Sequence, residues 1–277
     1  MSCNYELGIR TSELILCTRR IIIIKPKSFL HPTSYIPLFL SLARKIYWSL
    51  TCLITVLLLV SKSIASSPLR QRCSVAAPFA LFYYGDISLI KDDMKNLAFV
   101  GSRKINPYGE KMTIKLVQGL CSEYNIVSGL AAGIDACAHN ACVNKLGKTI
   151  AVLGCGIDMC YPTENYELYL SIRQEGLVIS EYPGKTPPAS AHFPIRNRLI
   201  VGFARSLIIP QAAKRSGTSI SAAYALDTGK EICCVPYPAT ANSFCNHLIQ
   251  YGAFLVENVQ DVLDVLSGVD KKPLFEM

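Results

Sequence analysis

The part of this sequence that is long enough to form a large domain has no net charge. Residues 77–277 contain eighteen Lys or Arg and eighteen Asp or Glu, whereas residues 1–76 contain ten basic residues and two acidic ones. The excess of +8 therefore belongs to the N-terminal quarter of the 277-residue chain. A uniformly basic surface is excluded for residues 77–277, so a nucleic-acid site there needs local clustering of cations.

Metal-ligand and redox motifs are missing as well. The twelve cysteines include no C-x-x-C pair, and the four histidines show no ligand spacing. Most cysteines lie in apolar runs, as Cys233 and Cys234 do, so we expect small buried hydrophobic residues in a reducing compartment. The pattern argues against a disulfide framework, and we expect neither a metal nor a cofactor.

The fingerprints of common nucleotide enzymes are incomplete. Residues 147–149 (Gly-Lys-Thr) resemble the end of a P-loop, but Cys142 stands where its first glycine belongs, and a strand follows. Residues 154–156 (Gly-Cys-Gly) lack the third glycine of a dinucleotide fingerprint, since Met159 takes its place. Neither a Ser-His-Asp order nor a pair of catalytic carboxylates can be argued. These absences favour a binding protein over an enzyme.

The N-terminal extension, residues 1–76, is basic and partly hydrophobic but specifies no clear fold. Residues 46–61 carry no charge, yet this run is slightly shorter than the roughly 17 to 25 residues of a spanning helix. A second apolar cluster, residues 21–24, has no informative period. Two interpretations stay open: a membrane segment over residues 46–61, or an extension outside the working protein.

From residue 77 to 267, buried-strand patterns alternate with helical ones. Strands are expected at 78–85, 97–100, 125–129, 149–154, 177–180, 206–209, 231–235 and 254–257. Helices are expected at 108–124, 134–146, 164–174, 196–204, 219–226, 248–250 and 259–266. This alternation predicts an α/β domain with a Rossmann-like, doubly wound, mainly parallel sheet and helices on both faces. Residues 268–277 form a C-terminal tail.

Candidate binding residues occur where the strands end. In a parallel sheet these loops share one edge, where glycine permits close approach and helix N-termini favour anions. A further loop supplies two guanidinium groups and a phenyl ring, which suits phosphates and a stacked base. The candidates are Gly101, Ser102, Arg103, Lys104, Ser128, Gly129, Gly133, Phe193, Arg196, Asn197, Arg198, Ser216, Gly217 and Thr218.

Structural interpretations of the same residues also stay open. A glycine-rich turn often serves only tight packing, and residues 216–218 also fit a plain helix N-cap. Asp135 fits a cap better than a catalyst, and His139 fits packing. Arg196 and Arg198, expected at a helix start, oppose the helix dipole and so call for a compensating anion.

Taken together, the motifs resemble one family closely, the DNA-processing protein A (DprA/Smf) family of bacterial single-strand DNA binders. The resemblance covers roughly residues 78–258. The segments that carry it are 99–104 (Phe-Val-Gly-Ser-Arg-Lys), 128–139 (Ser-Gly-Leu-Ala-Ala-Gly-Ile-Asp-Ala-Cys-Ala-His), 151–158 with Tyr161-Pro162, 180–183, 193–198 (Phe-Pro-Ile-Arg-Asn-Arg), 215–218 (Arg-Ser-Gly-Thr) and 246–253.

This resemblance implies a non-enzymatic protein that binds single-stranded DNA in a basic pocket. It further implies a cytoplasmic homodimer that hands DNA to the RecA recombinase during natural transformation, that is, in competence. By position, the pocket would include Gly101, Ser102, Arg103, Phe193, Arg196, Asn197, Arg198, Ser216 and Gly217.

Some residues depart from the family pattern. Gln211 replaces a usual Glu, Ser219 and Ser221 replace Leu and Thr, and Tyr237 and Phe244 replace glycines. The last two put the final strand's loop in doubt, because Tyr and Phe tolerate positive φ poorly. The family's helical leader domain is not recognisable in residues 1–76, and the C-terminal winged helix that many members carry is absent.

Two alternative functions are kept. One is a phosphoribohydrolase acting on nucleoside monophosphates, like the LOG proteins, which would need a carboxylate for base chemistry. The other is a membrane-tethered DNA-uptake scaffold, which would need residues 46–61 to insert.

Overall fold

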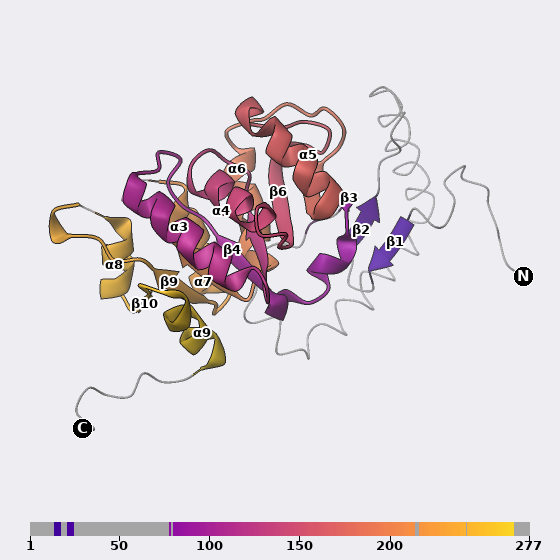
Figure 1. Cartoon of the computed structure of the whole chain (residues 1–277). Coiled ribbons are helices and arrows are strands. Elements are labelled where there is room, and N and C mark those ends of the chain that lie inside the picture. Colours follow the sequence, from indigo (N-terminus) through magenta and orange to yellow (C-terminus); the bar gives the residue numbers. More distant parts are fainter. Residues whose placement is uncertain are drawn as a thin grey trace, which may run out of the picture.

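The computed structural model describes residues 14–17, 21–24, 78, 80–213, 216–241 and 243–268 (Figure 1). The proposed membrane segment, residues 46–61, and residues 269–277 of the tail lie outside these ranges. Within them, no helix combines the length and the apolar character needed to cross a membrane.

One sheet organises the described residues. Its strands are β1 (Leu14–Cys17), β2 (Ile21–Ile24), β3 (Ala80–Gly85), β4 (Asn96–Phe99), β5 (Asn125–Ser128), β6 (Thr149–Gly156), β7 (Leu177–Tyr182), β8 (Ser206–Ile209), β9 (Glu231–Cys234) and β10 (Phe254–Leu255). They lie in the order β1-β2-β3-β7-β6-β5-β4-β8-β9-β10. The strands from β7 to β10 in this order are parallel, whereas β3 runs antiparallel to β7. The winding reverses between β4 and β8, where a doubly wound fold places its ligand site.

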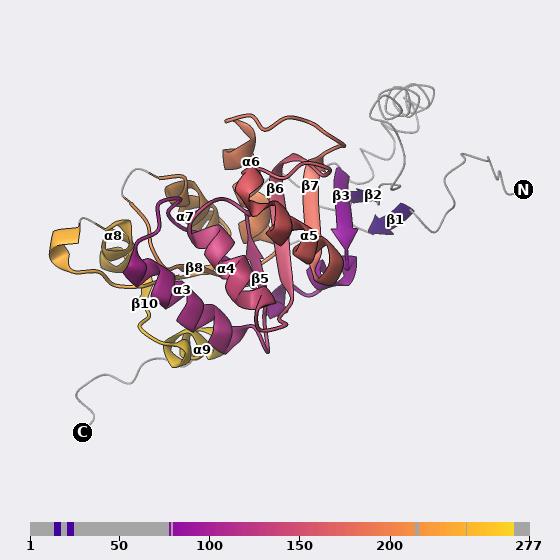
Figure 2. The ribbon, with the colours of Figure 1, turned by 45° about the horizontal axis from the view of Figure 1, so that its top comes forward.

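Helices cover both faces of the sheet (Figures 1 and 2). They are α3 (Pro107–Leu120), α4 (Ile134–Val143), α5 (Tyr166–Glu175), α6 (His192–Gly202), α7 (Thr218–Asp227), α8 (Phe244–Gln250) and α9 (Val259–Ser267), with short 3-10 turns at Ile87–Ile90, Asp93–Lys95, Thr163–Asn165 and Ala239–Ala241. The core assigns α6, α7 and α8 to one face and α3, α4, α5 and α9 to the other. The predicted fold class is therefore confirmed.

The alternation of side chains along each strand explains this two-sided packing. In β4, Ala98 faces the α6–α8 side, and Leu97 and Phe99 face the α3–α4 side; all three are fully buried. All eight residues of β6 are buried. Burial on both faces is why these strands read as continuous apolar runs in the sequence.

Helix α6 begins at His192, four residues earlier than expected from the sequence. Pro194 suggested a loop, but a proline within the first helical turn removes no internal hydrogen bond. Arg196 therefore lies in the second turn. The expectation that it sits at the helix start is wrong, and the anion that accompanies it, Asp135, compensates for its burial and not for the helix dipole.

The doubt about Tyr237 and Phe244 is removed. Among the described residues other than glycine, only Leu130 and Leu146 have positive φ. The Tyr237 hydroxyl donates to the Pro210 carbonyl at 3.2 Å, and the Tyr237 ring packs edge-on against Tyr108 at 5.0 Å. Both aromatic residues pack against the core.

The described cysteines behave as the sequence predicts. All eight are free thiols, and all but Cys137 are buried. Burial raises the pKa of the Cys142 thiol to about 12 and that of Cys155 to about 11. Such thiols stay protonated near neutral pH and act as small apolar groups.

Candidate nucleic-acid site

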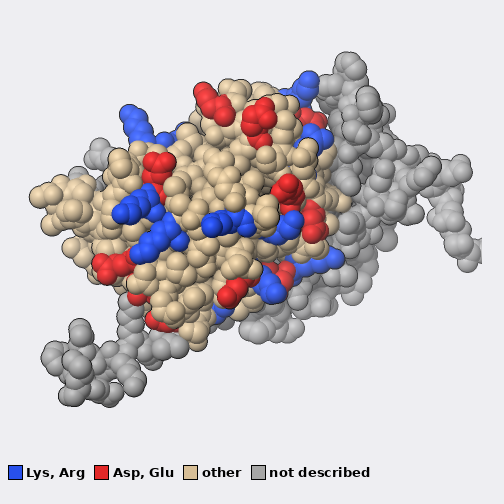
Figure 3. All heavy atoms as spheres, viewed as in Figure 1, with Lys and Arg blue, Asp and Glu red and all other residues tan. Residues whose placement is uncertain are grey.

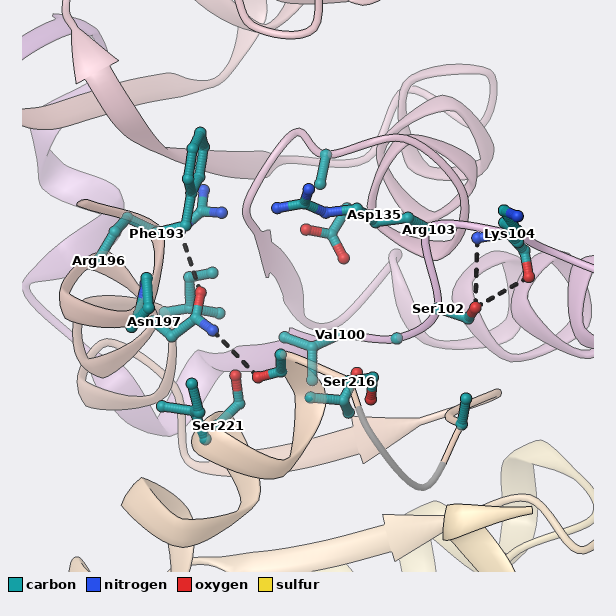
Figure 4. Close-up of a pocket in the computed structure, with 18 of the residues that line it drawn as sticks. Val100, Ser102, Arg103, Lys104, Asp135, Phe193, Arg196, Asn197, Ser216 and Ser221 are labelled. Atoms are coloured by element: carbon teal, nitrogen blue, oxygen red, sulfur yellow. Dashed lines mark hydrogen bonds between the residues drawn. The ribbon is translucent and has the colours of Figure 1, made fainter. Parts of the chain in front are cut away.

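A cavity of about 870 Å³ opens at the carboxyl ends of β4 and β8, where the winding reverses (Figure 4). Its walls come from the loop after β4, from α6 and from the start of α7. Most of the candidate residues line it, namely Gly101, Ser102, Arg103, Lys104, Phe193, Arg196, Asn197, Ser216, Gly217 and Thr218.

A hydrogen-bonded loop carries the basic wall. The Ser102 amide donates to the Gln211 carbonyl at 2.8 Å, and the Ser102 hydroxyl donates to the Lys104 carbonyl at 2.9 Å. The Gln211 side chain holds the loop's far end, because its oxygen accepts from the Asn106 amide at 3.0 Å and its nitrogen donates to the Lys104 carbonyl at 3.1 Å. Neither Arg103 nor Lys104 forms an ion pair with a residue that the structure describes. The Arg103 side chain reaches into the cavity toward Phe193, and Lys104 lies beside it on the same loop (Figure 4).

The first turn of α7 forms the opposite wall. Ser221 is 1% exposed, and within the described ranges neither its hydroxyl nor that of Ser216 has a hydrogen-bond partner. No side chain caps the helix at Gly217. A buried hydroxyl without a partner costs free energy, and a helix N-terminus favours anions. The wall is therefore suited to receive oxygen atoms of an anionic ligand, and Figure 4 shows it facing the basic loop across the cavity.

The Phe193 ring lies near two guanidinium groups, one from the basic loop and one from α6. The Cζ of Arg103 is 5.4 Å from its ring centroid, and the Cζ of Arg196 is 5.8 Å away. Both distances fall within the range of cation–π attraction. Phe193 thus ties the basic loop to α6.

Arg196 is buried beneath the cavity and only 4% exposed. Its Nη1 donates to the Gly129 carbonyl at 2.5 Å and also to the Val152 carbonyl, so it joins the loop after β5 to the middle of β6. Burial lowers the pKa of the guanidinium, and the nearby Asp135 raises it again. The principal role of Arg196 in this geometry is to build the floor of the cavity.

Asp135 and His139 complete this buried polar floor. The Asp135 carboxylate accepts from the Gly129 amide at 3.2 Å; burial raises its pKa, and Arg196 lowers it. His139 Nδ1 lies 2.7 Å from the Thr149 hydroxyl, which donates its hydrogen to the Ile126 carbonyl. Nδ1 must therefore carry the imidazole proton, because the hydroxyl can only accept from it. His139 is neutral and structural, as the packing interpretation predicts.

Four candidates do not line the cavity. Arg198 forms an ion pair with Glu181 at 2.5 Å, and the Ser128 hydroxyl donates to the Phe99 carbonyl at 2.6 Å. A Cβ at Gly129 would lie 2.5 Å from Arg196 Nη1. Gly133, with φ of 82°, would bring a Cβ to 2.2 Å from the Ser102 carbonyl oxygen. These two glycines allow the floor and the basic loop to approach closely.

The structure adds cavity residues that the sequence analysis did not place there: Asp135, Tyr161, Gln211 and Ser221. Tyr161 was named only within a segment that carries the family resemblance, and Gln211 and Ser221 were noted only as departures from the family pattern. The signal that could have placed them at the cavity was their position in the sequence. Tyr161 and Gln211 follow strands, and Ser221 lies in the first turn of a helix. Arg215, which carries part of the Arg-Ser-Gly-Thr motif, lies outside the described residues.

Among the described residues, the face of the molecule seen in Figure 3 carries no patch of one charge sign that would attract a polyanion. On the face formed by α3, α4 and α5, Lys and Arg are interspersed with Asp and Glu (Figure 3). No group of His, Cys, Asp and Glu in the described part of the chain is arranged to bind a metal.

These features define a class: a Rossmann-like α/β protein with a partly basic cavity at the reversal point of its sheet. Within that class, the chain belongs to the family described as DNA recombination-mediator protein A, whose sequence profile matches residues 60–267. DNA processing protein DprA of Streptococcus pneumoniae is 44% identical over 189 residues, which cover 68% of this chain and 66% of the relative. Protein Smf of Escherichia coli is 37% identical over 194 residues, 69% of this chain and 51% of the relative.

Solved structures agree with this membership. The structure of the Streptococcus pneumoniae protein matches with a TM-score of 0.63 over 66% of this chain and 65% of the other. DNA processing protein A from Helicobacter pylori, studied for its mode of binding single-stranded DNA, matches with 32% identity and a TM-score of 0.65 over 70% of this chain and 89% of the other. The chain thus spans about half to two thirds of the sequence relatives' lengths.

Proposed function

We propose that this protein binds single-stranded DNA in the cavity between the basic loop and the first turn of α7. The observation that carries the proposal is the pairing of two unneutralised cations, Arg103 and Lys104, with the partnerless buried hydroxyl of Ser221. Cations and hydroxyl donors together suit phosphate oxygens. The Helicobacter pylori relative, with the same fold, is described as binding single-stranded DNA.

In the cell, the bound strand would be delivered to the RecA recombinase, and the protein would act in the cytoplasm as a homodimer. The family description, recombination mediator, supports the delivery role. The protein would act without chemistry on the DNA. The one carboxylate that lines the cavity within the described ranges, Asp135, is already engaged by the Gly129 amide and by the charge of Arg196.

The alternative of a nucleotide phosphoribohydrolase requires a free carboxylate as a base. Gln211 lines the cavity, and both ends of its amide are hydrogen-bonded to the basic loop. A neutral amide in that place does not supply the base. Incubation with nucleoside monophosphates, followed by chromatography for released base, tests this alternative directly.

The binding test uses the full chain, a labelled oligonucleotide and fluorescence anisotropy. Lys104→Ala and Arg103→Ala should each weaken binding and flatten its salt dependence, because each lost phosphate contact removes about 0.7 from the slope of log K against log salt for single strands. Lys145→Ala is the matched control: it removes the same charge from an exposed residue at the C-terminal end of α4, on the opposite edge of the sheet.

Equal affinities for Lys104→Ala, Arg103→Ala and Lys145→Ala would contradict the cavity assignment. RecA delivery is tested separately, by asking whether the protein accelerates RecA filament formation on DNA coated with single-strand binding protein. Light scattering of the full chain tests the homodimer.

A further inference from the structure

The cavity has a second aromatic ring, Tyr161, which packs against Phe193. Tyr161 follows β6 and lines the cavity, yet it is 43% exposed. Burial raises the pKa of the Cys155 thiol, and the charge of Arg196 and then a backbone hydrogen bond from Tyr161 lower it in part. The ring is therefore exposed on an anchored backbone.

Phe193, the ring expected to stack on a base, is already surrounded. Besides the two guanidinium groups, its centroid lies 5.6 Å from that of Tyr161 at an interplanar angle of 40°. A Cβ built on Gly154 would lie 2.7 Å from the Phe193 ring, so this ring also packs closely against β6. Aromatic rings in direct contact have centroids about 4.5 to 7 Å apart, so no base fits between Phe193 and Tyr161.

Tyr161 differs from Phe193 in what covers it. Its ring contacts Phe193, and within the described ranges no cation and no further ring packs on it. Pro188 and Pro194 also line the cavity and add apolar surface to it. An exposed ring on such a wall offers an unoccupied π-face, and every nucleobase has one to match.

The spacing along the cavity links this ring to the phosphate site. Arg103 Cζ lies 5.4 Å from the Phe193 ring centroid, and the Tyr161 ring centroid lies 5.6 Å from the same point. Because both groups contact the same ring, one short strand could place a phosphate on Arg103 and a neighbouring base on Tyr161.

We propose that Tyr161 is a base-stacking residue that accepts a nucleobase of the bound strand on its exposed face. Phe193 supports the Tyr161 ring and links it to the cation that holds the phosphate. This inference rests on the proposed function, because it names how the same cavity contacts the bases. Stacking is tolerant of sequence, so the subsite would add affinity without selecting a particular base.

The test compares Tyr161→Leu with Tyr161→Phe in the full chain, using two oligonucleotides of equal length and charge. One is oligo(dT); the other carries abasic sites and presents phosphates without bases. Tyr161→Leu should weaken binding to oligo(dT) about tenfold or more, which corresponds to the ~1 to 3 kcal/mol of one base–aromatic stack. It should leave binding to the abasic strand unchanged, and Tyr161→Phe should match the wild type on both.

The possible outcomes separate this inference from the proposed function. If Tyr161→Leu binds both strands as the wild type does while Arg103→Ala binds neither, the stacking role is wrong and the cavity assignment stands. Equal losses on both strands, or a loss in Tyr161→Phe as large as in Tyr161→Leu, also overturn the stacking role. If the wild type binds neither strand, both proposals fall.

A spectroscopic readout checks the contact itself. An oligonucleotide with one 2-aminopurine loses fluorescence when that base stacks on an aromatic ring. Moving the 2-aminopurine along the strand should identify a position quenched by the wild type and by Tyr161→Phe but not by Tyr161→Leu. A quenching pattern that is the same for all three proteins would contradict the proposal.

Discussion

Arg196 donates a hydrogen bond of 2.5 Å from Nη1 to the main-chain carbonyl of Gly129, beneath the cavity rather than into it. The sequence motif Phe-Pro-Ile-Arg-Asn-Arg gives no indication of this direction. The structure gives the three arginines of the predicted site three different roles. Arg103 faces the cavity, Arg196 supports it from below, and Arg198 pairs with Glu181.

The first prediction separates Arg103 from Arg196. Arg196→Met should lower the free energy of unfolding by about 3 to 5 kcal/mol, because it leaves the Asp135 carboxylate buried without its compensating charge. Arg103→Met should leave stability within about 0.5 kcal/mol, as is usual for exposed sites. Urea unfolding followed by circular dichroism measures both.

If Arg196→Met were as stable as the wild type, the floor described here would not depend on that side chain. A double variant of Arg103 and Arg196 cannot distinguish loss of binding from loss of folding. The change at Arg103 is expected to weaken binding, whereas the change at Arg196 is expected to destabilise the fold.

The second prediction concerns the buried hydroxyl of Ser221. Ser221→Ala should keep or slightly raise the free energy of unfolding, because it removes a polar group that lacks a partner in the free protein. The same change should weaken binding of single-stranded DNA about tenfold, the effect of one hydrogen bond to a charged group.

Ser219→Ala is the control on the same helical turn, since the Ser219 hydroxyl donates to the Ser216 carbonyl at 2.8 Å and already has a partner. Stability loss in Ser221→Ala without any loss of affinity would assign the hydroxyl to the fold and not to the ligand.

The third prediction concerns the ion pair between Arg198 and Glu181, whose side chains are 11% and 16% exposed. Arg198→Leu should destabilise the protein by about 2 kcal/mol or more, because Glu181 is left mostly buried and unpaired. The double change to leucine at both positions should recover much of this loss. Binding of single-stranded DNA, measured by anisotropy on the folded variants, should be unchanged in both. Weaker binding in the stable double variant would show that Arg198 reaches the ligand.

The fourth prediction concerns acid. Burial, and secondarily the charge of Arg196, lower the pKa of His139 to about 3, whereas the ordinary value is 6.5. Between these two values the unfolded chain binds more protons than the folded protein, so stability falls as pH falls. The contribution is about 1.4 kcal/mol for each pH unit below the ordinary pKa.

His139→Gln cannot take up this proton, so its unfolding free energy should depend less steeply on pH in the same window. The raised pKa of Asp135 acts in the opposite direction but is common to both proteins. Denaturant titrations at several pH values between about 4.5 and 7 compare the slopes. Parallel slopes would mean that His139 is protonated in the folded state.

The fold could be predicted from the sequence because its strands are buried on both faces and its helices have separate apolar periods. Those signals are local, and they placed the strands from β3 to β10 and the helices from α3 to α9, although α8 begins at Phe244, four residues before the expected 248. The start of α6 was missed, because Pro194 was taken as a boundary although the first turn of a helix tolerates it.

The candidate site was predictable to the extent that loops at the ends of parallel strands must share one edge. The type of a residue in a loop does not, however, reveal whether its side chain points into the cavity or beneath it. The position of Arg196 beneath the cavity depends on carbonyl groups from β6 and from the loop after β5, segments far from α6 in sequence. Tyr161 could not be assigned for a related reason: its exposure follows from how the chain leaves β6, which no local pattern records.

Gln211 holds the basic loop at two points with an uncharged amide, where the family pattern has a carboxylic acid. A carboxylate could accept from the Asn106 amide in the same way, but it would repel the Lys104 carbonyl and partly cancel the field of the neighbouring cations. The Gln211 amide therefore holds the loop in place without adding a negative charge beside it. An approaching polyanion would be attracted by the charges of Arg103 and Lys104 without that opposing charge.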